Sequence, residues 1–194
     1  MARETQIERK TKETDITVAL NLDGIGKNEI ETGIGFFDHM LTAFAVHGRF
    51  DLVIKTLGDL HVDCHHTVED TGIVLGKALA KILGDKSGIE RFGSFYIPMD
   101  EALAHVSIDV SGRPFLIFNT RFKDERIGSL DTATIIEFWR AFAFNAGITL
   151  HINMIYGKND HHKCEAIFKA VAQALRIAVA SSQNQETLST KGIL

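Results

Sequence analysis

Two copies of one short pattern contain the residues of this chain that are best suited to chemistry. Residues 63–70 read Asp-Cys-His-His-Thr-Val-Glu-Asp, and residues 159–166 read Asn-Asp-His-His-Lys-Cys-Glu-Ala. Each copy has two adjacent histidines, then a glutamate three residues on, and it opens an apolar stretch of helical period. The candidate ligands are His65, His66 and Glu69 in the first copy and His161, His162 and Glu165 in the second. Imidazole and carboxylate groups together suit a borderline divalent metal such as Mn, Fe, Co or Zn.

The helical period predicts how each set of ligands is arranged. Residues three and four apart share one face of a helix, so we expect Glu69 to lie under both His65 and His66. The two rings should diverge by about 100°, which is one residue's turn of the helix. A single ion could hardly bind both rings of one copy. Two ions, each taking one ring from each copy, fit this geometry better.

Other residues close to the motifs have more than one interpretation. Lone histidines at a helix start are ordinarily structural, but four histidines and two glutamates in a repeated context favour a metal site. Aspartates flank both copies and would either orient imidazole N–H groups or place favourable negative charge at a helix N-terminus. These aspartates are Asp63, Asp70 and Asp160. Cys164 is expected to be a small buried hydrophobe rather than a thiolate ligand.

The elements that must position these ligands also occur twice. A helix, a strand and a loop precede each motif, and the tripeptide Ala-Phe-Ala recurs at 43–45 and 141–143. We therefore predict a duplicated chain, with a first repeat over 1–92 and a second over 93–194. Strand runs that alternate with paired helices favour an α+β sandwich with sheets outside and helices inside. Helices are expected over 36–46 and 134–145, and strands over 5–11, 15–22, 49–56, 93–110, 114–121 and 148–154.

Composition sets bounds on the function. The 194 residues carry a formal charge of −4, which argues against a general nucleic-acid binder, and they are 45% hydrophobic, as in ordinary globular proteins. The N-terminus is charged from its third residue, unlike a signal peptide, and no apolar run is long enough to span a membrane. The cysteines are Cys64 and Cys164 alone, so a reduced, cytoplasmic protein is expected.

Longer motifs extend over essentially the whole chain and resemble those of imidazoleglycerol-phosphate dehydratase, the lyase of histidine biosynthesis. Besides the two histidine motifs, they are Arg9-Lys-Thr-Lys-Glu-Thr, Gly33-Ile-Gly-Phe-Phe-Asp-His-Met-Leu, Pro98-Met-Asp-Glu-Ala-Leu-Ala, Asp109-Val-Ser-Gly-Arg-Pro and Ser189-Thr-Lys-Gly. The resemblance implies an α+β fold of two similar halves, with a four-helix layer between two four-stranded sheets, like domain 2 of ribosomal protein S5. It also implies a homo-oligomer of 24 subunits built from trimers, with two Mn ions in each active site between neighbouring subunits.

The resemblance further assigns roles to residues by position. One ion would be held by His39, His66, Glu69 and His162, and the other by His65, His161 and Glu165. Glu137 stands where the family often has a histidine, and it is a further candidate because a carboxylate can also bind Mn. The acid/base candidates are Glu13 and Glu165.

The implied reaction removes water from imidazole glycerol phosphate to give imidazole acetol phosphate, with the metal-bound imidazolate assisting loss of hydroxide. The phosphate should bind away from the metals, because a dianion on Mn would compete with the imidazole. The residues expected to bind it are Arg91, Arg113, Lys169, Ser189 and Lys191. Two alternatives use similar ligands. A dinuclear metallohydrolase would usually have more carboxylates, and a metal-storage protein would lack the phosphate site.

Overall fold

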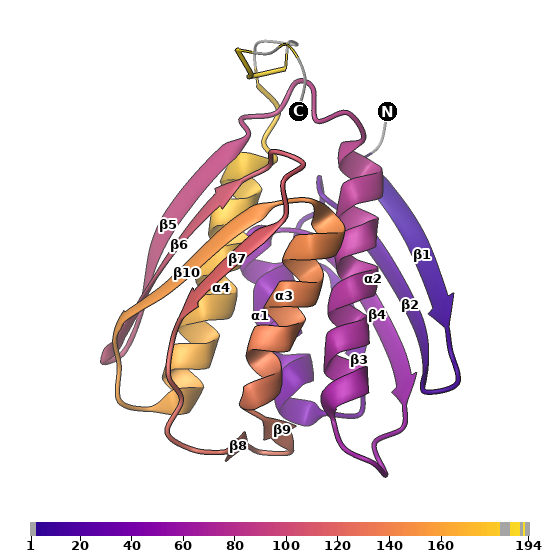
Figure 1. Ribbon diagram of the computed structural model, residues 1–194, viewed down its shortest axis with the longest axis vertical. Helices are drawn as coiled ribbons and strands as arrows, with labels where there is room; N and C mark the ends of the chain where they lie inside the picture. Colours follow the sequence, from indigo (N-terminus) through magenta and orange to yellow (C-terminus); the bar gives the residue numbers. More distant parts are fainter. Residues whose placement is uncertain (1–2, 183–186, 191, 193–194) are drawn as a thin grey trace.

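Two four-stranded sheets form the outer layers of the computed structural model, which describes residues 3–182, 187–190 and 192. The strand order is β1-β2-β4-β3 in the first sheet and β5-β6-β10-β7 in the second (Figure 1). The first sheet consists of β1 (Glu4–Lys10), β2 (Thr14–Asn21), β3 (Asn28–Glu31) and β4 (Asp51–Gly58). The second consists of β5 (Phe92–Met99), β6 (Ala102–Asp109), β7 (Phe115–Asn119) and β10 (Thr149–Tyr156). Two short strands, β8 (Arg126–Ile127) and β9 (Leu130–Asp131), pair separately.

The two sheets are built in the same way. In the first, β2 pairs antiparallel with β1 and β4, and β3 pairs parallel with β4. In the second, β6 pairs antiparallel with β5 and β10, and β7 pairs parallel with β10. Sequence alternation explains the orientation of the strands: Ile16, Val18 and Leu20 of β2 are buried, while Thr17 and Ala19 lie on the other face. The prediction of a duplicated α+β fold is confirmed.

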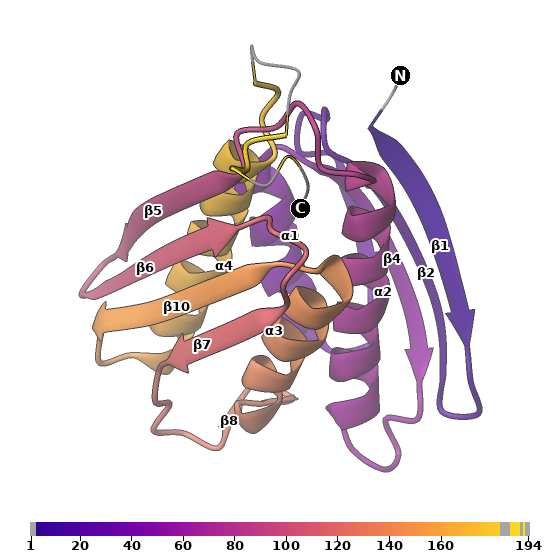
Figure 2. The same cartoon turned by 45° about the horizontal axis from the view of Figure 1, so that its top comes forward.

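Four helices fill the space between the sheets (Figures 1 and 2). They are α1 (Gly35–Gly48), α2 (His65–Leu83), α3 (Ala133–Ala146) and α4 (Asp160–Ala178). Helix α2 packs on β1 and β2, and α4 packs on β5 and β6. Helices from opposite halves also pack on each other, α1 on α4 and α2 on α3. Each repeat therefore contributes helices to a shared core, as expected for a layered α+β fold.

The contact between α2 and α3 is unusually close because α2 carries glycines at the interface. A Cβ atom at Gly72 would lie 2.6 Å from the carbonyl oxygen of Phe138, and one at Gly76 would lie 2.6 Å from that of Phe142. No side chain can be accommodated at such a distance from backbone without moving the helices apart. The aromatic residues opposite, Phe138 and Phe142, are themselves almost fully buried.

One expected strand is divided in the structure. The segment 93–110 was expected to be extended throughout, but it forms the hairpin of β5 and β6, with a turn at Asp100 and Glu101. Asp100 has a φ of 46°, in the left-handed region, which aspartate tolerates better than most residues. The inward-facing residues change from odd positions in β5 to even positions in β6 across Asp100 and Glu101, so the sequence did contain a sign of the turn, which the expectation of a single strand overlooked.

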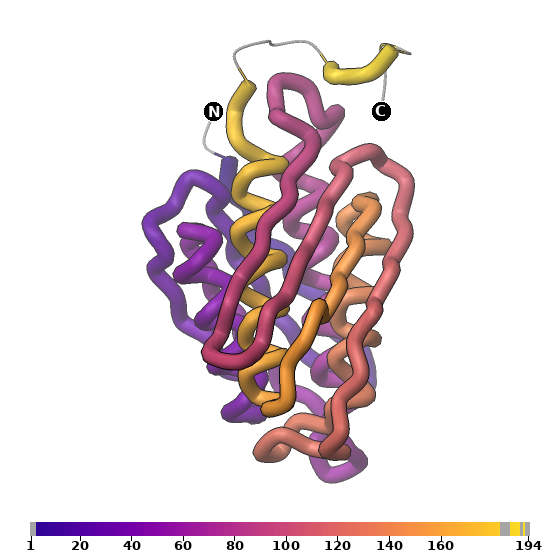
Figure 3. Tube along the Cα trace, turned by 90° about the vertical axis from the view of Figure 1, so that its left-hand side faces the viewer, coloured from indigo at the N-terminus to yellow at the C-terminus, as the bar shows by residue number. Residues whose placement is uncertain are grey.

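Helices α2, α3 and α4 all begin at the lower end of the molecule in Figure 1, so both histidine motifs lie at that end. The turn between β5 and β6 and the loop from β10 to α4 lie at the same end (Figure 3). Among the described helices, none is both long and apolar enough to cross a membrane. The fold thus brings the first turns of helices and several connecting loops together at one end of the sandwich.

Candidate metal and substrate site

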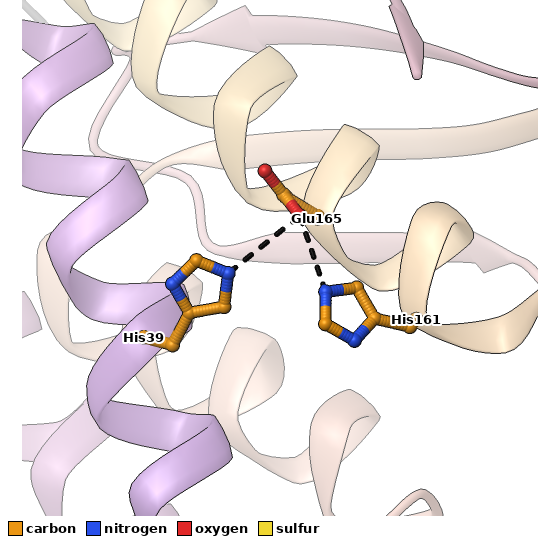
Figure 4. Close-up of side chains that lie close together, drawn as sticks. All are labelled: His39, His161 and Glu165. Atoms are coloured by element: carbon orange, nitrogen blue, oxygen red, sulfur yellow. Dashed lines mark ion pairs between the residues drawn. The ribbon is translucent and has the colours of Figure 1, made fainter. Parts of the chain in front are cut away.

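The largest group of candidate ligands combines two helices from different halves of the chain. His39 lies on α1, and His161 and Glu165 lie one turn apart at the start of α4 (Figure 4). Glu165 Oε2 is 3.6 Å from His39 Nε2 and 3.3 Å from His161 Nε2. The possible ligand atoms of the three residues lie within 4.8 Å of one another. Among the residues that the structure describes, no other trio of histidine, cysteine and acidic side chains could share an ion in this way.

Glu165 is held in its ionised form at the centre of this group. Its side chain is only 10% exposed, and Lys169 Nζ lies 2.6 Å from its Oε1 atom. Burial by itself raises the pKa of the Glu165 carboxyl, but the hydrogen bond and charge of Lys169, with the nearby His39 and His161, lower that pKa overall. One carboxylate oxygen therefore faces a cation, and the other faces two imidazoles, a donor set that suits a divalent metal.

The first copy of the motif forms a smaller group at the start of α2. Glu69 Oε2 lies 3.1 Å from His65 Nε2, one helical turn away. The rings of His65 and His66 are nearly perpendicular, at 85°, with their centroids 6.0 Å apart. Glu69 therefore contacts His65, as expected, whereas the described contacts of the His66 ring are with other carboxylates.

The second histidine of each pair is hydrogen-bonded through Nδ1. His66 Nδ1 lies 3.0 Å from Asp59 Oδ2, and His162 Nδ1 lies 2.7 Å from Glu101 Oε2. These contacts raise the pKa of both imidazoles. The pKa of Glu101 falls to about 2, because its carboxylate accepts a hydrogen bond from the backbone N–H of Asn159 as well as facing His162.

Neither Asp59 nor Glu101 was singled out from the sequence as a functional residue. Both lie in turns, where no periodicity connects them with the histidine motifs. The available signals were weak: Asp59 follows Gly58 in the segment just before the first motif, and Glu101 belongs to the polar pair at which the alternation of 93–110 changes phase.

The three flanking aspartates have structural contacts. Asp63 accepts a hydrogen bond from the backbone N–H of His65 at 2.7 Å. Asp70 accepts hydrogen bonds from Arg9 and Thr14, each at 2.5 Å. Asp160 pairs with Lys163 and accepts backbone N–H groups of the β7–β8 connection. None of the described hydrogen bonds and ion pairs of these aspartates reaches an imidazole ring. Asp63 and Asp160 lie at helix N-termini, as the alternative expected, whereas Asp70 lies beyond the first turn of α2 and holds β1 and β2 through Arg9 and Thr14.

Glu137 lies beside the first motif. It forms an ion pair with Arg140 on α3. It also lines a pocket of about 510 Å³ together with His65, Arg126 and Asp131. The carboxylate and the His65 ring thus border the same space.

The expected phosphate-binding residues form two groups. Arg91 donates two hydrogen bonds to Asp109, at 2.7 and 3.2 Å, and Arg113 donates one to the same carboxylate at 3.4 Å. Arg91 also donates to the carbonyl oxygen of Leu188, so the tail beside Ser189 lies over this pair. Lys169, by contrast, pairs with Glu165. The expected residue Lys191 lies outside the described residues.

The division of ligands between two ions stays a prediction. Within one chain His39 lies with His161 and Glu165, whereas the family's arrangement assigns it to the other set. None of the described ion pairs or ring contacts joins the two histidine pairs. If each ion binds one histidine from each of the two motifs, those histidines must therefore come from different subunits.

Both cysteines are free and buried. Burial raises the pKa of the Cys164 thiol, so it is neutral at physiological pH and unsuited to bind a metal as a thiolate. Cys64 Sγ accepts a hydrogen bond from the backbone N–H of Asp131 at 3.4 Å. The interpretation of Cys164 as a small buried hydrophobe agrees with its complete burial.

Comparison with known proteins identifies the family. The family model described as imidazoleglycerol-phosphate dehydratase matches residues 32–175. A relative of that name from Acetivibrio thermocellus is 54% identical over 195 residues, and the match covers 100% of both chains. The chain belongs to the imidazoleglycerol-phosphate dehydratase family.

Further relatives agree with the dehydratase assignment. An imidazoleglycerol-phosphate dehydratase from Methylorubrum populi is 56% identical, covering 99% of this chain and 100% of its own. The crystal structure of the Staphylococcus aureus subsp. aureus N315 enzyme superposes with a TM-score of 0.84 at 42% identity, covering 92% of this chain and 99% of that one. The Pyrococcus furiosus structure, in complex with (S)-C348, has a TM-score of 0.83 at 39% identity and covers 97% and 100%. The dehydratase is a lyase of histidine biosynthesis, which decides against metal storage and metallohydrolysis.

Replacing His39 in this dehydratase tests whether α1 contributes to a metal site. We expect His39→Ala to lose Mn on dialysis to the same extent as His161→Ala, because each removes one nitrogen from the group around Glu165. The measurement is the Mn content per chain by elemental analysis after Mn loading.

His151→Ala, which removes an exposed ring on β10, is the matched control and should retain Mn as the wild type does. Normal retention in His39→Ala together with loss in His161→Ala would remove His39 from the ligand group.

Proposed function

We propose that this chain is a manganese-dependent hydro-lyase that converts imidazole glycerol phosphate to imidazole acetol phosphate and water. The observation that carries the metal dependence is the group of His39, His161 and Glu165, whose ligand atoms lie within 4.8 Å of one another. Its two imidazole nitrogens and one carboxylate oxygen form a mixed N,O donor set, which Mn accepts. Three ligand atoms leave coordination positions for the substrate and for residues of a neighbouring subunit.

The residues of the first motif support a second ion. His65 and Glu69 offer a nitrogen and an oxygen 3.1 Å apart, and Glu137 borders the same pocket as His65. A bound divalent ion would act as a Lewis acid that favours the anionic form of the substrate's imidazole ring. The chain's own residues would hold that ring between the two sets of ligands. They would also direct the hydroxyl-bearing carbons of the substrate toward a carboxylate.

Geometry favours Glu13 over Glu165 as the residue that exchanges protons with the substrate. Both oxygens of Glu165 are engaged, one by Lys169 and the other by two imidazoles. Glu13 lies in the turn between β1 and β2, with its side chain 54% exposed and its Oε1 atom 3.9 Å from His66 Nε2. A carboxylate that is accessible and close to the ligands can reach a substrate held there. In this proposal Glu165 is a ligand and Glu13 is the acid or base.

The phosphate would bind to the cationic residues around Asp109. Arg91 and Arg113 converge on that carboxylate, and the side chain of Arg113 is 68% exposed, so its guanidinium is free to turn to a phosphate. Guanidinium groups match the geometry of phosphate oxygens and bind them in a bidentate manner. The tail lies against Arg91 at Leu188, which supports a role for Ser189 and Lys191 in covering the phosphate.

We further propose that the enzyme works in the cytoplasm as a homo-oligomer of 24 subunits built from trimers. The ligand groups of a single chain support assembly, because each offers fewer protein ligands than an octahedral ion can bind. Two free, buried cysteines are in keeping with a reducing compartment.

The proposed function is tested by turnover of imidazole glycerol phosphate by chelator-stripped protein that is titrated with Mn²⁺. We expect no activity without metal, and activity that rises to a plateau at about two ions per chain. Formation of the ketone product is followed directly, and bound Mn is measured in the same samples.

Full activity in the metal-free protein would contradict the metal dependence. An inactive protein that nevertheless binds the ions would contradict the role proposed for them in this chain.

Arg113→Ala tests the phosphate site. Loss of one charge-assisted hydrogen bond to phosphate costs about 1.5–3 kcal/mol, so KM should rise about 10- to 100-fold. The kcat should change little, because the phosphate does not react and its contacts are similar in the ground and transition states. The measurement is steady-state kinetics at saturating Mn²⁺.

Lys55→Ala is the control, since Lys55 is an exposed cation on β4 that pairs with Glu29. Equal KM values in Arg113→Ala and the wild type would show that the phosphate binds elsewhere.

A further inference from the structure

The second histidine of each motif is fixed in the same way, although the two supporting residues are unrelated in the duplication. His66 Nδ1 lies 3.0 and 3.2 Å from the two oxygens of Asp59. His162 Nδ1 lies 2.7 Å from Glu101 Oε2. In each case a carboxylate from a connecting loop reaches the ring nitrogen nearer to the backbone.

The two carboxylates come from non-equivalent parts of the two halves. Asp59 follows β4 directly and so lies in the loop from β4 to α2, whose counterpart is the loop from β10 to α4. Glu101 lies in the turn between β5 and β6, whose counterpart is the turn between β1 and β2 that contains Glu13. The same contact therefore arose by different means in the two halves. Common descent from the original unit does not account for it, which points to a shared requirement.

Glu101 is itself held in place. Its Oε1 atom accepts hydrogen bonds from the backbone N–H groups of Lys158 and Asn159, at 2.9 and 2.7 Å, while Oε2 faces His162. Asn159 in turn caps α4 by accepting the backbone N–H groups of His161 and His162. The β5–β6 turn, the loop before α4 and the ring of His162 are thus connected through one carboxylate, in the region shown at the lower end of Figure 3.

A carboxylate at Nδ1 has a definite chemical effect. It accepts a hydrogen bond, so it favours the neutral tautomer in which Nδ1 carries the proton and Nε2 keeps its lone pair. Nε2 of His66 then points toward Glu13, at 3.9 Å, and Nε2 of His162 points toward Asp100, at 3.6 Å. Both free lone pairs are directed away from the supporting carboxylate and toward other acidic groups.

We propose that Asp59 and Glu101 are positioning residues that fix His66 and His162 through Nδ1 and so present Nε2 of each ring to a divalent cation. This proposal rests on the metal dependence put forward above. In this proposal His66 and His162 have the same role, although Asp59 holds the first ring and Glu101 the second. It also explains why Asp59, whose side chain is 16% exposed, is directed at a ring rather than into solvent.

The test is Mn²⁺ affinity of Asp59→Asn and Glu101→Gln, measured on the full chain after chelator stripping by electron paramagnetic resonance of free Mn²⁺. Each variant keeps the size of the side chain but replaces the anionic acceptor by an amide, so we expect Kd for at least one ion to rise about 10- to 100-fold. Thermal unfolding of the metal-free proteins should be close to that of the wild type, which separates a positioning role from a loss of fold.

Asp63→Asn is the matched control. Asp63 carries the same charge within the motif but accepts the backbone N–H of His65, a contact that asparagine reproduces as a helix cap. This variant should bind Mn²⁺ like the wild type. Wild-type affinity in both Asp59→Asn and Glu101→Gln would overturn the proposal while leaving the proposed function intact. Failure of the wild type itself to bind Mn²⁺ would overturn the proposed function, and this proposal with it.

Discussion

The packing of helices from opposite halves of the chain is the constraint on which the site depends. Helix α1 of the first half lies against α4 of the second, and this contact alone brings His39 beside His161 and Glu165. On the other side, α2 approaches α3 so closely that Gly72 and Gly76 leave no space for a Cβ atom. The two sheets cover opposite faces of this four-helix layer. A change in the separation of the helices would therefore alter the ligand distances directly.

Duplication supplies two similar sets of candidate ligands, but their surroundings differ. The second half provides Glu165, which is buried, paired with Lys169 and shared between two imidazoles. The first half provides the more exposed pair of His65 and Glu69, with Glu137 across the pocket. The supporting carboxylates differ as well. The symmetry of the fold is thus retained in the backbone and in the His–Glu pair of each motif, whereas the surrounding charged residues differ.

Much of the fold could be predicted from the sequence, because its signals are local. Apolar residues of helical period after each histidine pair predicted α2 and α4, and the repeated Ala-Phe-Ala indicated the duplication of α1 and α3. The contacts of His65 with Glu69 and of His161 with Glu165 followed from the helical turn alone, since the residues of each pair lie one turn apart.

The remaining site residues could not be predicted from local pattern because tertiary contacts position them. His39 reaches Glu165 only through the packing of α1 on α4. Glu101 was missed because the change of phase at Asp100 and Glu101 marks a turn but does not show that this turn contacts His162. Asp59 lies in a loop, whose course depends on what it packs against. Pairs within one helix could thus be predicted from local pattern, whereas contacts between separate elements could not.

The central claim is that helices from the two halves together form a metal site, and crystallography with Mn²⁺ tests it most directly. Anomalous difference maps from crystals of the Mn-loaded protein, collected on both sides of the Mn absorption edge, locate the ion without prior assumptions. The account predicts a peak bound by His39, His161 and Glu165. A protein that binds Mn²⁺ tightly but has its anomalous peaks away from these residues would contradict it.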